Sequence, residues 1–190
     1  MQNVTALKLM VLIGLMTLAV LVLTACRPAA APIAVSNQPV SVNGRRALKP
    51  IPEMSWTSGG DKVQKLADLN GKVVILDFWA TYCGPCKQAI PHLNSLVAKY
   101  GAENLQIVGL NVGGAEDKPK IPAFVASTKI DYQIAFPDED LKDFVFAETD
   151  SIPQAAVFDR KGRMITKTVG FSQAIQKQLD EAVEQAIRSQ

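Results

Sequence analysis

The feature that most restricts the fold of this chain is a run of apolar residues that leads directly into a pair of cysteines. Residues 73–80 read VVILDFWA, which is rich in β-branched and aromatic side chains. Such a run is typical of a central strand that is covered by helices on both faces. The sequence CGPC follows at residues 83–86, and the pattern to about Tyr100 predicts a helix. We therefore expect both cysteines at the junction of a buried strand and a helix.

Strands and helices alternate along the remainder of the chain. The patterns predict further strands at residues 53–57, 62–66, 105–112, 134–136, 155–158 and 164–169. They predict further helices at residues 120–129, 138–146 and 172–188, the last capped by Ser172. This alternation, with a hairpin and a closing helix at the end, indicates an α/β protein whose sheet lies between helices.

The 190 residues leave room for one globular domain, which we expect at residues 51–190. Residues 1–25 have the layout of a secretory signal peptide, because Lys8 precedes an apolar run from Leu9 to Leu23. That run is shorter than the roughly 20 residues that a helix needs to cross a bilayer, so a permanent transmembrane span is the weaker interpretation. Residues 26–50 mix Pro, Ala, Ser and basic residues, which predicts a flexible tether.

The end of the apolar run also indicates how the protein is held at a membrane. Leu23-Thr24-Ala25-Cys26 resembles the lipobox of bacterial lipoproteins, in which the cysteine becomes the first mature residue and carries the lipid. Each buried acyl methylene contributes about 0.8 kcal/mol to binding, so a multiply acylated Cys26 would hold firmly. The alternative is an ordinary cleaved signal peptide with a chance cysteine. We expect an extracytoplasmic protein of the periplasm or cell envelope, anchored through Cys26.

The charge pattern argues against a nucleic-acid partner. The formal net charge is +2, with 20 basic and 18 acidic side chains. There is no dense basic cluster and no interleaving of aromatic and basic residues of the kind that backbone binding needs.

The position of the cysteine pair predicts its chemistry. Unpaired backbone N–H groups and the dipole at a helix N-terminus stabilise an anion, so the pKa of Cys83 should be lowered and Cys83 should be the nucleophile. Cys86 lies one turn further on, close enough to form a disulfide with Cys83 and to act as the resolving thiol. Gly84 permits close approach of a substrate backbone, and Pro85 fits a helix start that needs no N–H.

A cysteine pair of this spacing has two other uses in proteins, as part of a zinc site or as a structural bridge. A zinc site needs about four ligands, and the predicted domain offers two thiols and the single histidine His92, so we expect no metal. An inert structural bridge would stabilise little across so short a loop and would not need a helix N-terminus. His92 lies nine residues beyond Cys83 on the same helix, which favours a surface or packing role over that of a catalytic base.

The segment FWATYCGPCK at residues 78–87 is similar to the active-site segment of thioredoxin-like proteins. From about Ile51 onward, the chain resembles the extracytoplasmic branch of that family, the thiol-disulfide oxidoreductases of the TlpA or ResA type. The resemblance implies a thioredoxin-like fold, with a central mixed β-sheet flanked by helices. It also implies an N-terminal strand extension and a helical insert after the second core strand.

An acidic residue inside the apolar run needs an explanation. Burial of Asp77 disfavours its charged form and raises its pKa, so Asp77 could accept the proton of Cys86, directly or through a water. The matching aspartate of thioredoxin is thought to do the same. The alternative is an Asp77 that is merely hydrogen-bonded at the sheet edge. Many members of the extracytoplasmic branch have asparagine in place of Asp77, and they often have glutamate in place of Ala89. Thioredoxin has a lysine in place of Gly109.

Four more residues are assigned to the substrate site. By the resemblance, Ile152-Pro153 matches the cis-proline loop that faces the CxxC sequence, with the Ile152 backbone pairing with substrate like an added strand. Pro153 has no backbone N–H, so it would place no hydrogen-bond donor beside the sulfurs. We also expect Trp79 and Tyr82 to border the site as an apolar contact surface, with simple packing as the alternative.

The resulting hypothesis is an enzyme that reduces protein disulfides outside the cytoplasm. The resemblance implies a membrane thiol electron donor of the DsbD or CcdA kind and a role in cytochrome c maturation. We expect no cofactor and a monomer. Oxidation or isomerisation of exported proteins is the runner-up, since it uses the same residues and differs in reduction potential. A thiol peroxidase, with Thr81 as the nearby hydroxyl, and a non-enzymatic binding lipoprotein are further alternatives.

Overall fold

A mixed sheet of seven strands runs through residues 48–189, which are the residues that the computed structural model describes. The strand order is β2-β1-β5-β4-β3-β6-β7. The strands are β1 (Ser55–Ser58), β2 (Lys62–Lys65), β3 (Val73–Trp79), β4 (Leu105–Asn111), β5 (Gln133–Pro137), β6 (Gln154–Phe158) and β7 (Met164–Val169). The α-helices are α2 (Gly84–Tyr100), α3 (Ile121–Thr128), α4 (Glu139–Val145) and α5 (Gln173–Arg188). Short 3-10 helices lie at Ile51–Glu53, Leu66–Leu69 and Lys118–Lys120.

Strand β3 lies inside the sheet, as its sequence predicts. It pairs in parallel with β4 and antiparallel with β6, and all of its residues are buried. Because successive side chains of a strand point to opposite faces, Val74, Leu76 and Phe78 face one side of the sheet while Ile75 and Asp77 face the other. The burial of both faces explains why the run is almost continuously apolar.

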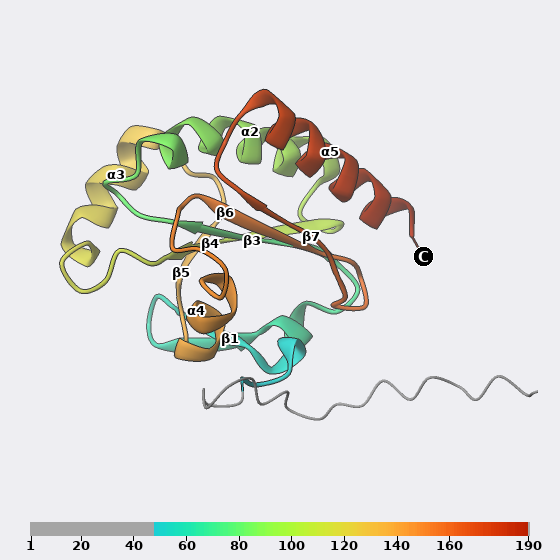
Figure 1. Ribbon diagram of the computed structural model, residues 1–190, viewed down its shortest axis with the longest axis horizontal. Helices are drawn as coiled ribbons and strands as arrows, with labels where there is room; N and C mark the ends of the chain where they lie inside the picture. The colour runs from blue at the N-terminus through green and yellow to red at the C-terminus, as the bar shows by residue number, and fades with distance from the viewer. Residues whose placement is uncertain (1–47, 190) are drawn as a thin grey trace, which may run out of the picture. The chain divides into compact units, whose positions relative to one another are not determined.

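The helices cover both faces of the sheet (Figure 1). Helix α4 packs on the face of Val74, through Leu141 and Val145. Helices α2 and α5 pack on the opposite face, where Leu93 and Val183 meet Ile75. The predicted layered α/β architecture is therefore confirmed.

A third apolar cluster surrounds the start of α2. It joins Trp79 and both cysteines to Ile121 and Phe124, which belong to the segment between β4 and β5. That segment carries α3 and is the predicted helical insert after the second core strand. The insert therefore belongs to the same apolar cluster as the cysteine pair.

The N-terminal part differs in detail from the prediction. The hairpin of β1 and β2 is the expected strand extension, but residues 51–53 form a 3-10 turn, and the first strand begins at Ser55 rather than at Glu53. Pro52 lies in the first turn of that element, where its fixed φ favours a turn over a ladder strand. Leu48 packs against the core and Lys49 pairs with Asp138, so these two residues belong to the domain and not to the predicted tether. The predicted signal peptide, most of the tether and Cys26 lie outside the described residues.

The predicted cap at Ser172 is confirmed, and Asp138, predicted as the start of a helix, is an N-cap as well. Asp138 accepts a hydrogen bond from the backbone N–H of Leu141 at 2.8 Å, and Ser172 accepts one from Ile175 at 3.3 Å.

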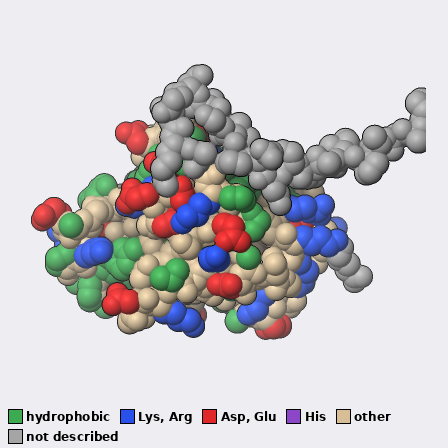
Figure 2. Space-filling model, turned by 90° about the horizontal axis from the view of Figure 1, so that it is seen from below, with side chains coloured by type: hydrophobic (Ala, Val, Ile, Leu, Met, Phe, Trp, Pro, Cys, Tyr) green, Lys and Arg blue, Asp and Glu red, His purple; other side chains and the backbone are tan. Residues whose placement is uncertain are grey.

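None of the helices within residues 48–189 combines the length and the apolar character that a membrane span requires. On the face seen in Figure 2, acidic and basic side chains are interspersed.

Candidate active site

The two cysteines lie at the start of α2 and are joined by a disulfide. Cys83 is the N-cap of the helix, and its Sγ accepts a hydrogen bond from the backbone N–H of Cys86 at 3.1 Å. Cys83 is 6% exposed and Cys86 is 2% exposed. The N–H groups that the cap position offers would stabilise a thiolate at Cys83 once the disulfide is reduced.

The two residues between the cysteines lie on the surface. Gly84 and Pro85 form the first turn of α2 and are both exposed. No atom lies within 4 Å of the place where a Cβ on Gly84 would stand. An approaching chain can therefore come close to the backbone beside the disulfide.

The loop before β6 packs against the apolar cluster that contains the disulfide. The peptide bond between Ile152 and Pro153 is cis, as the resemblance implies. Ile152 packs against the cluster that contains both cysteines, and Pro153 accepts a hydrogen bond from the N–H of Gly170 at 2.7 Å. This bond ties the loop to the end of β7.

The two aromatic residues that we expected to form one contact surface have different environments. Tyr82 is 70% exposed and is available to a partner. Trp79 is 1% exposed, and its ring stacks on Phe124 with 4.8 Å between the ring centroids. The expectation of a surface role for Trp79 is therefore wrong, because α3 covers it. Packing was the alternative considered for this residue.

Asp77 is buried on the α2 face of the sheet, and its partner is a tyrosine that the sequence reading missed. Burial raises the pKa of Asp77 to about 7, although a hydrogen bond from Tyr132 acts in the opposite direction. The hydroxyl of Tyr132 donates to Asp77 Oδ2 at 3.1 Å. The two residues are 55 positions apart, so no local pattern pointed to this pair.

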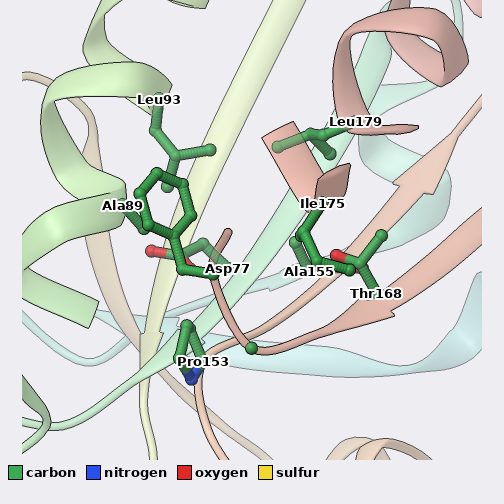
Figure 3. A pocket seen from close by; sticks show the side chains of 10 residues that line it. Asp77, Ala89, Leu93, Pro153, Ala155, Thr168, Ile175 and Leu179 are labelled. Carbon is green, nitrogen blue, oxygen red and sulfur yellow. The ribbon is translucent and has the colours of Figure 1, made fainter. Parts of the chain in front are cut away.

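A small cavity lies beside Asp77 and the cis-proline loop. Its volume is about 20 Å³, and its lining includes Ala89 and Leu93 of α2, Pro153 and Thr168. Figure 3 shows Asp77 between the two α2 side chains and Pro153. One water molecule needs roughly 10–15 Å³, so the cavity can hold one. Ala89 leaves this wall of the cavity apolar.

A second buried carboxylate holds the segment before the cysteines, and the sequence reading missed it as well. Asp117 accepts hydrogen bonds from the N–H and the hydroxyl of Thr81 and from Asn111. Burial alone would raise the pKa of Asp117, but these hydrogen bonds hold it below its ordinary value. The Thr81 hydroxyl is thus directed to Asp117, which weakens the peroxidase alternative that relied on it.

The remaining candidates have structural surroundings. His92 is largely buried, and its Nε2 lies 3.1 Å from Asp180 of α5, which agrees with the predicted packing role. Within residues 48–189, no group of three or more His, Cys, Asp or Glu side chains is placed to hold a metal ion.

Comparisons with known proteins agree with this geometry. The model of the AhpC/TSA family matches residues 48–167. The thiol-disulfide oxidoreductase ResA of Bacillus cereus is 30% identical over 111 residues, which are 58% of this chain and 62% of the relative. The thioredoxin-like protein YneN of Bacillus subtilis is 34% identical over 113 residues, which are 58% of this chain and 64% of that protein. These matches therefore span less than two thirds of either relative.

A solved structure extends the similarity over the whole fold. It is that of a candidate thiol:disulfide interchange protein DsbE from Chlorobium tepidum, and its TM-score is 0.62 at 29% identity. The similarity covers 74% of this chain and 97% of that protein. The expected thioredoxin-like fold is confirmed by this similarity.

Proposed function

Since the chain belongs to the AhpC/TSA family, we propose that it is a thiol-disulfide oxidoreductase that exchanges disulfides through Cys83 and Cys86. The observation that carries the proposal is the disulfide at the N-terminus of α2, with Cys83 as the cap. A thiol in this position is activated by the helix, and its partner one turn later can resolve a mixed disulfide.

The proposed reaction has two exchange steps. The Cys83 thiolate attacks a client disulfide, a bond forms between Cys83 and one client sulfur, and the other client sulfur leaves as a thiolate. Cys86 then loses its proton and attacks Cys83, so that the Cys83–Cys86 disulfide forms and the second client sulfur leaves. The client gains two electrons and takes up two protons, and the cysteine pair is oxidised.

The proposed substrates are protein disulfides. No atom fills the space beside Gly84, Tyr82 is exposed next to Cys83, and Ile152 packs against the apolar cluster that contains both cysteines. An extended client segment could pair with the backbone of Ile152 while its disulfide approaches Cys83. Pro153 offers no backbone N–H at this place.

We propose reduction as the physiological direction, because the Gly-Pro pair between the cysteines of the CGPC sequence resembles that of reducing members of the fold. Oxidation or isomerisation remains the second candidate, and the two differ in reduction potential. Equilibration of the protein with glutathione or dithiothreitol buffers tests this. A value near or below about −250 mV supports a reductase, while one of about −120 to −180 mV favours oxidation or isomerisation. Absence of a reversible dithiol would overturn the enzyme proposal.

The proposed location is the outer side of a membrane, with the lipid on Cys26 as anchor and residues 27–50 as tether. A membrane thiol carrier of the DsbD or CcdA kind would supply electrons, and apocytochrome c would be one client. Expression of the full chain and of Cys26→Ser, followed by detergent phase partition and mass spectrometry, tests the anchor. We expect the unchanged chain in the detergent phase with a lipidated Cys26, and the variant in the aqueous phase. Equal partition of both chains would contradict the anchor.

A further inference from the structure

The contact between Tyr132 and Asp77 crosses a strand. Tyr132 directly precedes β5, while Asp77 lies on β3, and β4 runs between them. Asp77 is paired with Gly109 of β4, and Gly109 is paired with Ile134 of β5. The Tyr132 hydroxyl therefore reaches Asp77 over the position of Gly109.

Gly109 makes this reach possible. A Cβ at Gly109 would stand 2.9 Å from Cε2 of Tyr132 and 3.0 Å from Nε1 of Trp79, which is closer than packed carbon atoms approach. The missing side chain thus leaves the space that the tyrosine ring occupies. Gly109 therefore leaves room for a polar partner of the buried Asp77.

The surroundings make Tyr132 the main polar neighbour of Asp77. The cavity walls from α2, β6 and α5 are the apolar side chains of Ala89, Leu93, Ala155, Ile175 and Leu179. Thr168 of β7 adds a hydroxyl, which donates to the carbonyl of Ala155 at 3.4 Å. On α2, His92 is paired with Asp180, and Cys86 belongs to the disulfide.

In the hydrogen bond between Tyr132 and Asp77, the proton is on the Tyr132 hydroxyl. Burial, together with the carboxylate of Asp77, raises the pKa of Tyr132 above its ordinary value. The phenol is therefore neutral over the working range of pH and donates to the ionised form of Asp77. A hydrogen bond to the charged form favours that form.

We propose that Tyr132 is a positioning residue that holds Asp77 through Oδ2 and sets the pH at which Asp77 accepts the proton of Cys86. This inference rests on the proposed function. When Cys86 attacks Cys83 in the mixed disulfide, the thiol proton passes to Asp77, directly or through a water. The Cys83–Cys86 bond forms, the bond from Cys83 to the client sulfur breaks, and the client thiolate leaves with the electron pair. Asp77 later returns the proton to solvent or to the client.

The contact itself is tested by titrating the carboxyl carbon of Asp77 by NMR in the oxidised protein. Tyr132→Phe removes only the hydroxyl, and we expect it to raise the midpoint by about 1–2 pH units, because a hydrogen bond to a charged group is lost. Tyr100→Phe, at a partly buried tyrosine of the α2 and α5 cluster, is the matched control and should leave the midpoint unchanged. An unchanged midpoint in Tyr132→Phe would overturn the proposal.

The role in the reaction is tested with the reduced protein and 5,5′-dithiobis(2-nitrobenzoate). Attack by Cys83 releases one coloured thiolate, and attack by Cys86 releases the second. We expect the rate of the second release to decrease at pH values below the midpoint of the Asp77 titration. Tyr132→Phe should slow the second release roughly tenfold at pH 7, because it moves that midpoint to higher pH. Gly109→Ala should move the midpoint in the same direction, because its Cβ displaces the tyrosine ring.

The outcomes separate the two proposals. If the unchanged protein releases no second thiolate, the proposed function fails, and the inference fails with it. If the second release occurs with the same pH midpoint in the unchanged protein and in Tyr132→Phe, the inference alone is overturned. A shift in Tyr132→Phe that is absent in Tyr100→Phe supports it.

Discussion

Thr81 donates both its backbone N–H and its hydroxyl to the carboxylate of Asp117, and this pair fixes the chain two residues before Cys83. The distance from the Thr81 nitrogen to Asp117 Oδ2 is 2.9 Å, and Asn111 donates to the same oxygen at 2.7 Å. Asp117 is buried and lies 36 positions from Thr81. The segment after β4 thus fixes the start of the active-site turn through Asp117.

Replacement of this carboxylate should destabilise the protein. Asp117→Ala leaves the donors of Thr81 and Asn111 unpaired in a buried place, and we expect the free energy of unfolding to fall by about 2–4 kcal/mol. Urea denaturation of the oxidised protein measures this. Asp131→Ala, at an exposed aspartate, is the control and should change stability by less than about 0.5 kcal/mol. Equal effects of the two variants would show that the hydrogen bonds to Asp117 contribute nothing.

The two cysteines should fail in different ways when each is replaced by serine. Cys86→Ser keeps the nucleophile but cannot resolve, so it should accumulate a mixed disulfide at Cys83 when incubated with glutathione disulfide. Cys83→Ser should react about tenfold more slowly at pH 7, because Cys86 lacks the cap position that lowers the thiol pKa. Mass spectrometry of samples quenched with acid distinguishes the two. A reversed order of reactivity would exchange the assigned roles.

Burial of Asp77 should make stability depend on pH. The folded-state pKa of Asp77 is raised from 3.8 to about 7, so its contribution to stability is fully present below about pH 4 and is lost as pH rises through 7. This pKa shift corresponds to a loss of about 4 kcal/mol in the free energy of unfolding between low and high pH. We expect Asp77→Asn to be more stable than the unchanged protein at pH 8 and equally stable near pH 4. Urea denaturation of the oxidised proteins at both pH values tests this, and a difference that does not vary with pH would contradict the buried charge.

The contact between α3 and the active site should appear in the fluorescence of Trp79. Phe124 stacks on Trp79, so Phe124→Ala should lower the free energy of unfolding by about 3–5 kcal/mol and shift the emission to longer wavelength as water reaches the indole. Phe124→Leu, which keeps most of the volume, should have a smaller effect on both. Unchanged emission in Phe124→Ala would mean that α3 does not shield Trp79.

Local patterns were sufficient for the elements and for the reacting pair. The strand predicted at residues 73–80, the helix start at Asp138, the cap at Ser172 and the cysteines at the start of α2 each depend on neighbours within a few positions. Periodicity and capping act over that range, which is why these predictions were confirmed. The first strand was placed too early, because local propensity does not reveal the 3-10 turn at residues 51–53.

The sequence by itself determined the α/β order, the position of Cys83 at a helix N-terminus and the presence of an acid inside the central strand. Only the tertiary structure decided what surrounds these groups. It brought Tyr132 to Asp77 across Gly109, Asp117 to Thr81, and Phe124 onto Trp79, which removed Trp79 from the surface. These contacts join residues on different strands and loops, and packing of the sheet and the insert selects them. The physical reason is that hydrogen bonding and burial depend on distance in space, whereas sequence patterns record distance along the chain.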